Sequence, residues 1–177
     1  MSENQKKVWI TGASSGIGKA LAEKFASEGW VVAISARRKE ILGEMSNHKN
    51  IFSYPLDVTN QDQVKTSFEK IIKDFKGLDL CVFSSGTYDP KLEQEINVKQ
   101  NKFVMETNYF GVLNCIKAVE TYFKNKKSGQ ISIVSSVAAY RGLPNSSGYG
   151  PSKAALTNLT ESIYFDFQPF YLKFLVF

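Results

Sequence analysis

A tyrosine and a lysine four residues apart, in the segment Tyr149-Gly-Pro-Ser-Lys153, offer the clearest chemistry in this sequence. If the segment begins a helix, the two side chains share one face, one turn apart. An ammonium beside a phenol favours the phenolate, which suits Tyr149 to proton transfer near neutral pH. Ser136 lies 13 residues before Tyr149, at the end of a β-branched run. The Tyr149–Lys153 pair therefore predicts a centre for proton transfer, close to the end of the strand that carries Ser136.

A glycine-rich segment near the start of the chain, Thr11-Gly-Ala-Ser-Ser-Gly-Ile-Gly18, follows an apolar run and precedes a helical pattern. In that setting the glycines permit a tight turn, let a pyrophosphate approach the backbone and allow close packing of helix on strand. The helix N-terminus presents free N–H groups and a partial positive charge to an anion. The segment therefore predicts a dinucleotide-binding loop whose cofactor contacts are Gly12, Ser14, Ser15, Gly16, Ile17 and Gly18.

The end of the next apolar run indicates which dinucleotide is bound. An acidic residue there would hydrogen-bond a ribose 2′-hydroxyl and select NAD. In this chain Ala36 occupies the position, and Arg37 and Arg38 follow it. Guanidinium groups bind a 2′-phosphate through charge-assisted hydrogen bonds, whereas the alternative is a pair of arginines that only solvate a turn. The missing acid and the paired arginines together favour NADP.

The elements that must position these residues follow from the hydrophobic pattern. Apolar or β-branched runs predict six strands, at residues 7–11, 30–36, 50–57, 78–84, 130–135 and 172–177. Helical periods predict helices at 17–28, from a cap at Thr59 or Asn60 to Gly77, at 97–125 and at 149–167.

This alternation of strands and helices predicts right-handed βαβ units. We expect a single α/β domain over residues 1–177 with a doubly wound, Rossmann-type parallel sheet and helices on both faces. In the first helix, Ile17, Ala20, Leu21 and Phe25 are predicted to form the apolar face. In such a sheet, ligands bind beyond the carboxyl ends of the strands.

The glycine spacing, the Ser136–Tyr149–Lys153 set and the order of elements resemble the short-chain dehydrogenase/reductase family, in its compact single-domain branch. The resemblance covers nearly the whole chain. It implies an NADP-dependent oxidoreductase that transfers a hydride between the nicotinamide and a carbonyl or alcohol. It further implies that Ser136 holds the substrate oxygen, that Tyr149 gives or takes the proton, and that Lys153 favours the phenolate and binds the nicotinamide ribose.

The same resemblance assigns roles to four more residues. Asn108 matches an asparagine that completes a proton relay through water, although an asparagine with only a structural role is the alternative. Asp57 and Val58 match the position that contacts the adenine ring. Gly86 matches the glycine that ends the fourth strand, but serines precede it where the family has asparagines. Ser135 is a weaker candidate than Ser136, since its spacing to Tyr149 differs by one.

Composition argues against several other classes of protein. The net charge of +5 is spread over lysines interleaved with acids, which is typical of a solvated surface rather than a nucleic-acid site. The single histidine, His48, lies in a polar stretch, and Cys81 and Cys115 lie in apolar ones, so no metal site is expected. Without a long apolar run or a signal core, we expect no membrane partner and a cytoplasmic protein.

Residues 87–98 and 138–147 are expected to line the pocket for a small carbonyl or alcohol substrate. A cofactor-binding or redox-sensing protein with weak catalysis is the alternative, because fold alone does not decide function. The resemblance also implies a homodimer or homotetramer. Since the chain ends at a sixth strand, we expect a truncated member that lacks the family's substrate-covering segment and last strand, with a short variant sealed by dimerisation as the alternative.

Overall fold

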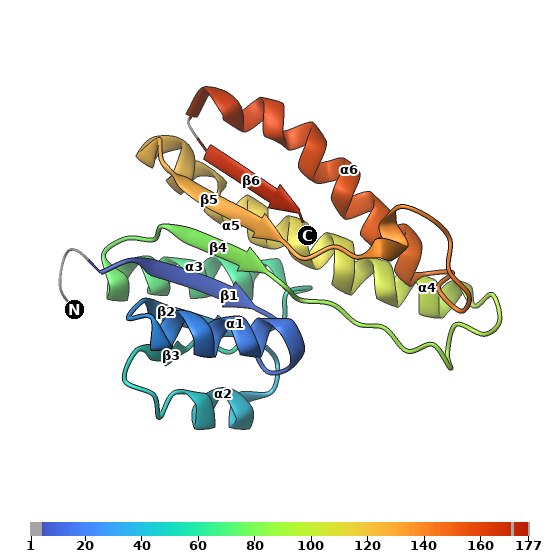
Figure 1. Ribbon diagram of the computed structural model, residues 1–177, viewed down its shortest axis with the longest axis horizontal. Helices are drawn as coiled ribbons and strands as arrows, with labels where there is room; N and C mark the ends of the chain where they lie inside the picture. The colour runs from blue at the N-terminus through green and yellow to red at the C-terminus, as the bar shows by residue number, and fades with distance from the viewer. Residues whose placement is uncertain (1–4, 171, 177) are drawn as a thin grey trace.

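The computed structural model describes residues 5–170 and 172–176 and shows a parallel sheet covered by helices (Figure 1). Its strands are β1 (Lys7–Thr11), β2 (Val31–Ser35), β3 (Ile51–Ser53), β4 (Leu80–Phe83), β5 (Gly129–Ile133) and β6 (Leu172–Val176). They pair in the order β3-β2-β1-β4-β5-β6, and every pair is parallel. The predicted doubly wound fold is therefore confirmed, and the order reverses between β1 and β4, where such sheets bind ligands.

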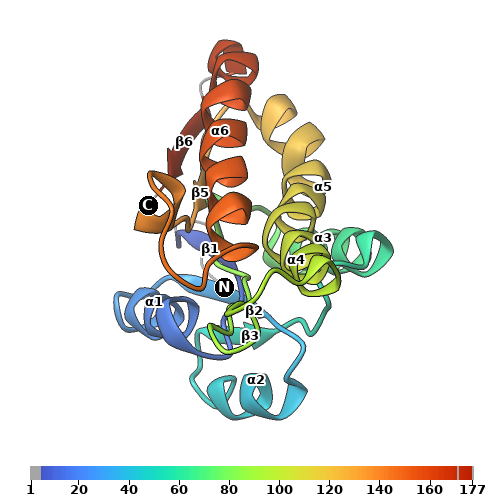
Figure 2. The same ribbon diagram turned by 90° about the vertical axis from the view of Figure 1, so that its right-hand side faces the viewer.

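The helices form two layers around this sheet. They are α1 (Gly16–Ser27), α2 (Lys39–Met45), α3 (Gln61–Phe75), α4 (Val98–Met105), α5 (Gly111–Lys126) and α6 (Tyr149–Phe167). Successive strand residues point to opposite faces, so Val8 and Ile10 pack with α1 and α2, whereas Trp9 packs with α3, α5 and α6. At one end, α4 lies beside α6 (Figure 2). None of the described helices combines the length and apolarity needed to cross a bilayer.

The first helix packs by a different face from the predicted one. Gly18, Ala22 and Ala26 are its buried residues, and Leu21 and Phe25 are only partly buried. Ile17 is 58% exposed, so it does not contribute to the core. The small side chains on this face let α1 lie close to the sheet. The spacing of the larger apolar residues did not indicate this.

Two other elements differ from their predicted form. The third strand was expected at 50–57, but its regular part ends at Ser53. The chain continues beside β2 and the residue after it, with the N–H groups of Tyr54 and Leu56 donating to the carbonyl oxygens of Ile34 and Ala36, while Pro55 has no N–H to donate. The short α2 was not predicted, because only Leu42 and Met45 in it are buried. Phe177, included in the expected sixth strand, lies outside the described residues.

The long helix predicted at 97–125 is continuous but irregular. A π-turn, η1 (Glu106–Phe110), joins α4 to α5. Such turns contain one residue more than a regular turn and often occur at functional sites. Asn108 lies in this turn and is completely buried.

Candidate active site

The glycine loop lies at the reversal point of the sheet and is held there by close backbone contacts. Gly12 has φ +70°, and a Cβ on it would lie 2.6 Å from the carbonyl oxygen of Ser84. A Cβ on Gly18 would lie 2.5 Å from the carbonyl oxygen of Gly12. Both positions therefore require glycine, the first for its conformation and the second for its contact. Ser15 precedes α1 without capping it through its side chain, so the first N–H groups of the helix face the loop.

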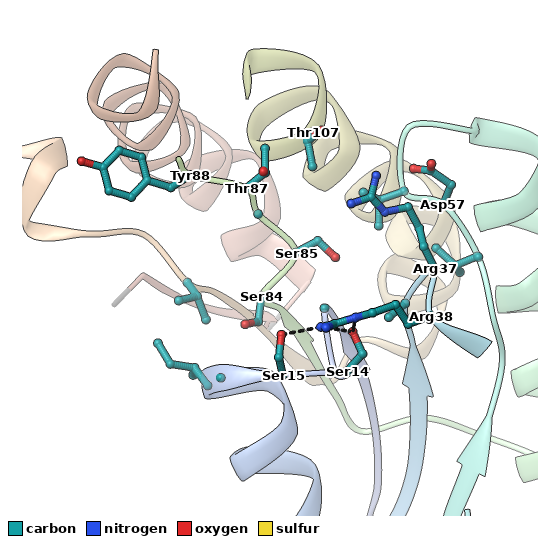
Figure 3. A pocket seen from close by; sticks show the side chains of 18 of the residues that line it. Ser14, Ser15, Arg37, Arg38, Asp57, Ser84, Ser85, Thr87, Tyr88 and Thr107 are labelled. Carbon is teal, nitrogen blue, oxygen red and sulfur yellow. Dashed lines mark hydrogen bonds between the residues drawn. The ribbon is translucent and has the colours of Figure 1, made fainter. Parts of the chain in front are cut away.

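The two arginines extend from the end of β2 into the same hollow as the loop (Figure 3). Arg38 donates from Nε and Nη2 to Ser14 Oγ at 3.1 and 2.9 Å, and from Nη2 to Ser15 Oγ at 2.6 Å. Within the described part of the chain, neither guanidinium forms a salt bridge with a carboxylate. The structure thus gathers positive charge and hydroxyl groups beside an open helix N-terminus, which is an arrangement suited to phosphate.

Asp57 and Val58 also line this cleft, and Asp57 lies near Arg37 (Figure 3). Asp57 Oδ1 accepts hydrogen bonds from the N–H and the hydroxyl of Thr59, at 3.0 and 2.9 Å. Val58 is buried, and a Cβ on Gly111 would lie 2.6 Å from its Cγ2 atom. These contacts fix the position of the wall that the resemblance assigns to the adenine ring.

Tyr149 and Lys153 occupy the first two turns of α6 and line the cleft together with the glycine loop. Lys153 Nζ lies 5.7 Å from the centroid of the Tyr149 ring and donates to the carbonyl oxygen of Val134 at 2.8 Å. Burial lowers the pKa of Lys153 from 10.5 to about 8. The cleft encloses about 650 Å³ and reaches from the arginines to this pair.

The two neighbouring serines are engaged differently. Ser135 Oγ donates to the carbonyl oxygen of Lys153 at 3.1 Å and lies 3.0 Å from Thr157 Oγ1, so its hydroxyl is used to hold α6. Ser136 Oγ accepts a hydrogen bond from the N–H of Ala138 at 3.2 Å and keeps its own proton for another partner. Ser135 lines the cleft and Ser136 is not among its lining residues, but of the two it is Ser136 whose hydroxyl proton is used by no contact in the described residues.

Gly86 lies next to both Asn108 and Lys153. The carboxamide of Asn108 accepts from the N–H of Thr87 at 2.7 Å, and donates to the Thr87 carbonyl and to Ser152 Oγ, both at 3.0 Å. A Cβ on Gly86 would lie 3.5 Å from Asn108 Oδ1 and 3.6 Å from Lys153 Nζ. Asn108 therefore connects the loop after β4 to α6 through three hydrogen bonds.

Two contacts to Tyr149 were not predicted. The ring of Tyr88 lies 4.4 Å from the ring of Tyr149, centroid to centroid, at an interplanar angle of 31°. The carboxylate of Glu93 accepts a hydrogen bond from the backbone N–H of Tyr149 at 3.1 Å. Sequence patterns contain no signal for contacts between residues more than fifty positions apart in an irregular loop and a helix. Among the described residues, no cluster of three or more histidine, cysteine or acidic side chains could hold a metal ion.

Comparison with known proteins gives consistent matches. The chain is 30% identical over 171 residues to 3-ketodihydrosphingosine reductase of Bacteroides thetaiotaomicron, covering 94% of this chain and 60% of that protein. It is 31% identical over 163 residues to the 3-oxoacyl-(acyl-carrier-protein) reductase FabG of Staphylococcus aureus, covering 89% and 66%. The chain thus spans about half to two thirds of the length of the curated relatives it matches.

Solved structures and a family model agree with these relatives. A short-chain dehydrogenase from Streptomyces avermitilis superposes with a TM-score of 0.89 at 27% identity, covering 99% of this chain and 65% of that one. ElxO with NADP bound gives a TM-score of 0.90 at 28% identity, covering 97% and 72%. The family model described as short chain dehydrogenase matches residues 6–174. On this match, which spans nearly the whole sequence, the chain belongs to the short-chain dehydrogenase family.

Proposed function

We propose that this chain provides the cofactor site and catalytic centre of an NADP-dependent oxidoreductase, which transfers a hydride between the nicotinamide and a carbonyl or alcohol. One observation carries the proposal: Tyr149 and Lys153 line the same cleft as the glycine loop and the two arginines. A proton-transfer pair and a phosphate site at opposite ends of one cleft suit a reaction that moves a hydride and a proton together.

The residues of the cleft fit a dinucleotide with a 2′-phosphate. The turn at Gly12 leaves no room for a Cβ, and the start of α1 offers free N–H groups to a pyrophosphate. Arg38 is already directed toward the loop by Ser14 and Ser15, and Arg37 extends beside it. When bound, the nicotinamide would supply or accept the hydride. NADP is present in one of the similar solved structures, ElxO.

The chain's own residues would handle the substrate oxygen and its proton. Ser136 has a free hydroxyl proton with which to bind that oxygen. In reduction, the hydroxyl of Tyr149 would protonate the oxygen as it gains negative charge, and in oxidation the same group would remove the proton. Lys153, charged below its pKa of about 8, would favour the phenolate that the transfer creates. Asn108 would hold the loop after β4 against this centre through its bonds to Thr87.

The substrate is proposed to be a carbonyl compound with a sizeable apolar part. The segments 87–98 and 138–147 are proposed to receive the substrate, and several large apolar side chains in them, or directly before them at Val137, are exposed. These side chains are Tyr88, Leu92, Ile96, Val98, Val137, Tyr140 and Leu143. Exposed apolar groups next to a cleft favour an apolar ligand over a polar one. Two of the similar proteins are named 3-ketodihydrosphingosine reductase and 3-oxoacyl-(acyl-carrier-protein) reductase, and both names specify a keto or oxo group in the substrate.

Replacing Tyr149 by phenylalanine tests the proposal. We expect the turnover of NADPH with a panel of ketones and aldehydes to fall by about 10²–10⁴-fold, because the hydroxyl that transfers the proton is lost. The dissociation constant for NADPH, measured by fluorescence, should change little. Tyr164→Phe is the matched control, since Tyr164 is 41% exposed and lies in the last part of α6, outside the lining of the cleft. Near-normal turnover by Tyr149→Phe, or no turnover by the unmodified enzyme with any substrate, would refute the proposed function.

A further inference from the structure

The loop between β4 and α4, residues 84–97, is attached to the start of α6 at several points. Thr87 is held by Asn108, which is also bonded to Ser152 of α6. Tyr88 stacks on Tyr149, and its hydroxyl lies 3.1 Å from the carbonyl oxygen of Asn145. A third attachment is formed by Glu93, a residue to which the proposed reaction gives no role.

Glu93 is an acidic residue with only 3% of its surface exposed. One carboxylate oxygen, Oε2, accepts hydrogen bonds from the backbone N–H groups of Gly148 and Tyr149, at 2.8 and 3.1 Å. The other oxygen, Oε1, is buried and has no hydrogen-bond partner among the described residues. Burying a charged group costs free energy unless neighbouring groups compensate the charge. The buried carboxylate of Glu93 must therefore be stabilised by the groups around it.

The start of α6 supplies the compensation. The helix has no side-chain N-cap and no acidic residue in its first turn. Of its first backbone groups, the N–H of Gly150 is bonded to the Ser146 carbonyl, and Pro151 has none. The N–H groups of Gly148 and Tyr149 are the two that remain, and Glu93 accepts both. Its negative charge also lies at the positive end of the helix dipole.

We propose that Glu93 is a positioning residue for the catalytic tyrosine: from the loop 84–97 it fixes the backbone of Tyr149 and with it the direction of the phenol. This inference depends on the proposed function, in which Tyr149 transfers the proton. The loop that holds the backbone of Tyr149 through Glu93 also contacts its ring through Tyr88, so this one segment contacts both parts of the tyrosine. A misplacement of a reacting group by about 1 Å can reduce a rate by about 10²-fold.

Two substitutions separate the geometry of this contact from its charge. Glu93→Ala removes the acceptor of both bonds. Glu93→Gln keeps an acceptor oxygen for both N–H groups and places its NH₂ where Oε1 makes no bond. Glu161→Gln is the matched control, since Glu161 is an exposed residue of α6 that belongs neither to the loop 84–97 nor to the lining of the cleft. All are made in the full-length enzyme, and thermal unfolding checks that each is folded.

For Glu93→Ala we expect kcat to fall by about 10- to 100-fold, with the KM for NADPH within about twofold of the parent value. Glu93→Gln should restore kcat to within about fivefold, and Glu161→Gln should have no effect. A loss confined to kcat and rescued by glutamine distinguishes positioning from a general loss of stability. Equal kcat in Glu93→Ala and the control, or a parallel loss in Glu93→Gln, would overturn the proposal.

Hydrogen exchange of the Gly148 and Tyr149 amides tests the contact without any turnover. Exchange should become faster by about tenfold or more in Glu93→Ala and change little in Glu93→Gln. If the parent enzyme shows no turnover, the proposed function fails, and with it the link to catalysis, even where exchange confirms the contact. If the parent turns over and neither kcat nor exchange responds to Glu93→Ala, the inference fails while the proposed function stands.

Discussion

Replacing Lys153 by methionine should make the cofactor-free protein more stable and, at the same time, inactive. Lys153 is 4% exposed, and Nζ donates one hydrogen bond, to the carbonyl oxygen of Val134 at 2.8 Å. Burial lowers its pKa from 10.5 to about 8, which means that the folded protein disfavours the ammonium. Methionine has a similar length and shape without the charge, so the substitution removes that cost and leaves the packing nearly unchanged.

The size of the effect follows from the two pKa values. The change from 10.5 to about 8 corresponds to about 3 kcal/mol of destabilisation, since each pH unit is worth about 1.4 kcal/mol. Losing the bond to Val134 offsets about 1 kcal/mol of the gain. We therefore expect Lys153→Met to raise the free energy of unfolding by about 2 kcal/mol at pH 7.

The gain should depend on pH in a defined direction. Below pH 8 the lysine is charged in the folded and unfolded states, and the full cost of burying the charge is present. Between about pH 8 and 10.5 the folded state loses its proton first, so the cost disappears as pH rises. Urea unfolding at pH 7 and pH 10 measures the difference, with Lys99→Met as an exposed control. A Lys153→Met protein that is less stable at pH 7, or whose gain is equal at both pH values, would refute this reasoning.

Two further predictions concern the cofactor end of the cleft. Replacing Arg37 and Arg38 together by alanine should raise the KM for NADPH by about 10- to 100-fold and leave the KM for NADH nearly unchanged, because only NADPH has the 2′-phosphate. If the KM values for NADH and NADPH are nearly equal in both the parent and the variant, the assignment is wrong. Gly12→Ala should destabilise the fold by about 2 to 5 kcal/mol through its positive φ and its contact with Ser84, whereas Gly43→Ala, with open space around it in α2, should be neutral or stabilising in urea unfolding. Similar midpoints for the two glycine variants would show that the turn at Gly12 tolerates a side chain.

The parts of the site that the sequence predicts well are formed by residues close together in the chain. The glycine loop and the Tyr149–Lys153 pair are each formed within eight residues, and their chemistry follows from spacing alone. The order of strands and helices then brings them to the same edge of the sheet, because parallel strands end on one side. The grouping of both in one cleft was therefore predictable without coordinates.

What the sequence does not predict depends on contacts between distant segments. Ile17 was predicted both to contact the cofactor and to share the apolar face of the first helix, but the close approach of α1 through glycine and alanine leaves it exposed in the lining of the cleft. The π-turn around Asn108 follows no pattern of apolar residues, and the bond from Glu93 to Tyr149 spans 56 positions. Such features arise from the packing of a whole domain, which no window of sequence contains.

The π-turn between α4 and α5 limits how this part of the chain can evolve. Its extra residue advances everything after it by about 100° relative to a straight α-helix. As a result α4 contacts α6, while α5 packs on α3. Exchanging one side chain within Glu106–Phe110 leaves that offset intact, but deleting one residue would turn all of α5 away from its neighbours and take Asn108 out of its contacts. Homologous sequences should therefore vary here in composition far more readily than in length, and alignments that place a gap in this turn should be treated as misaligned.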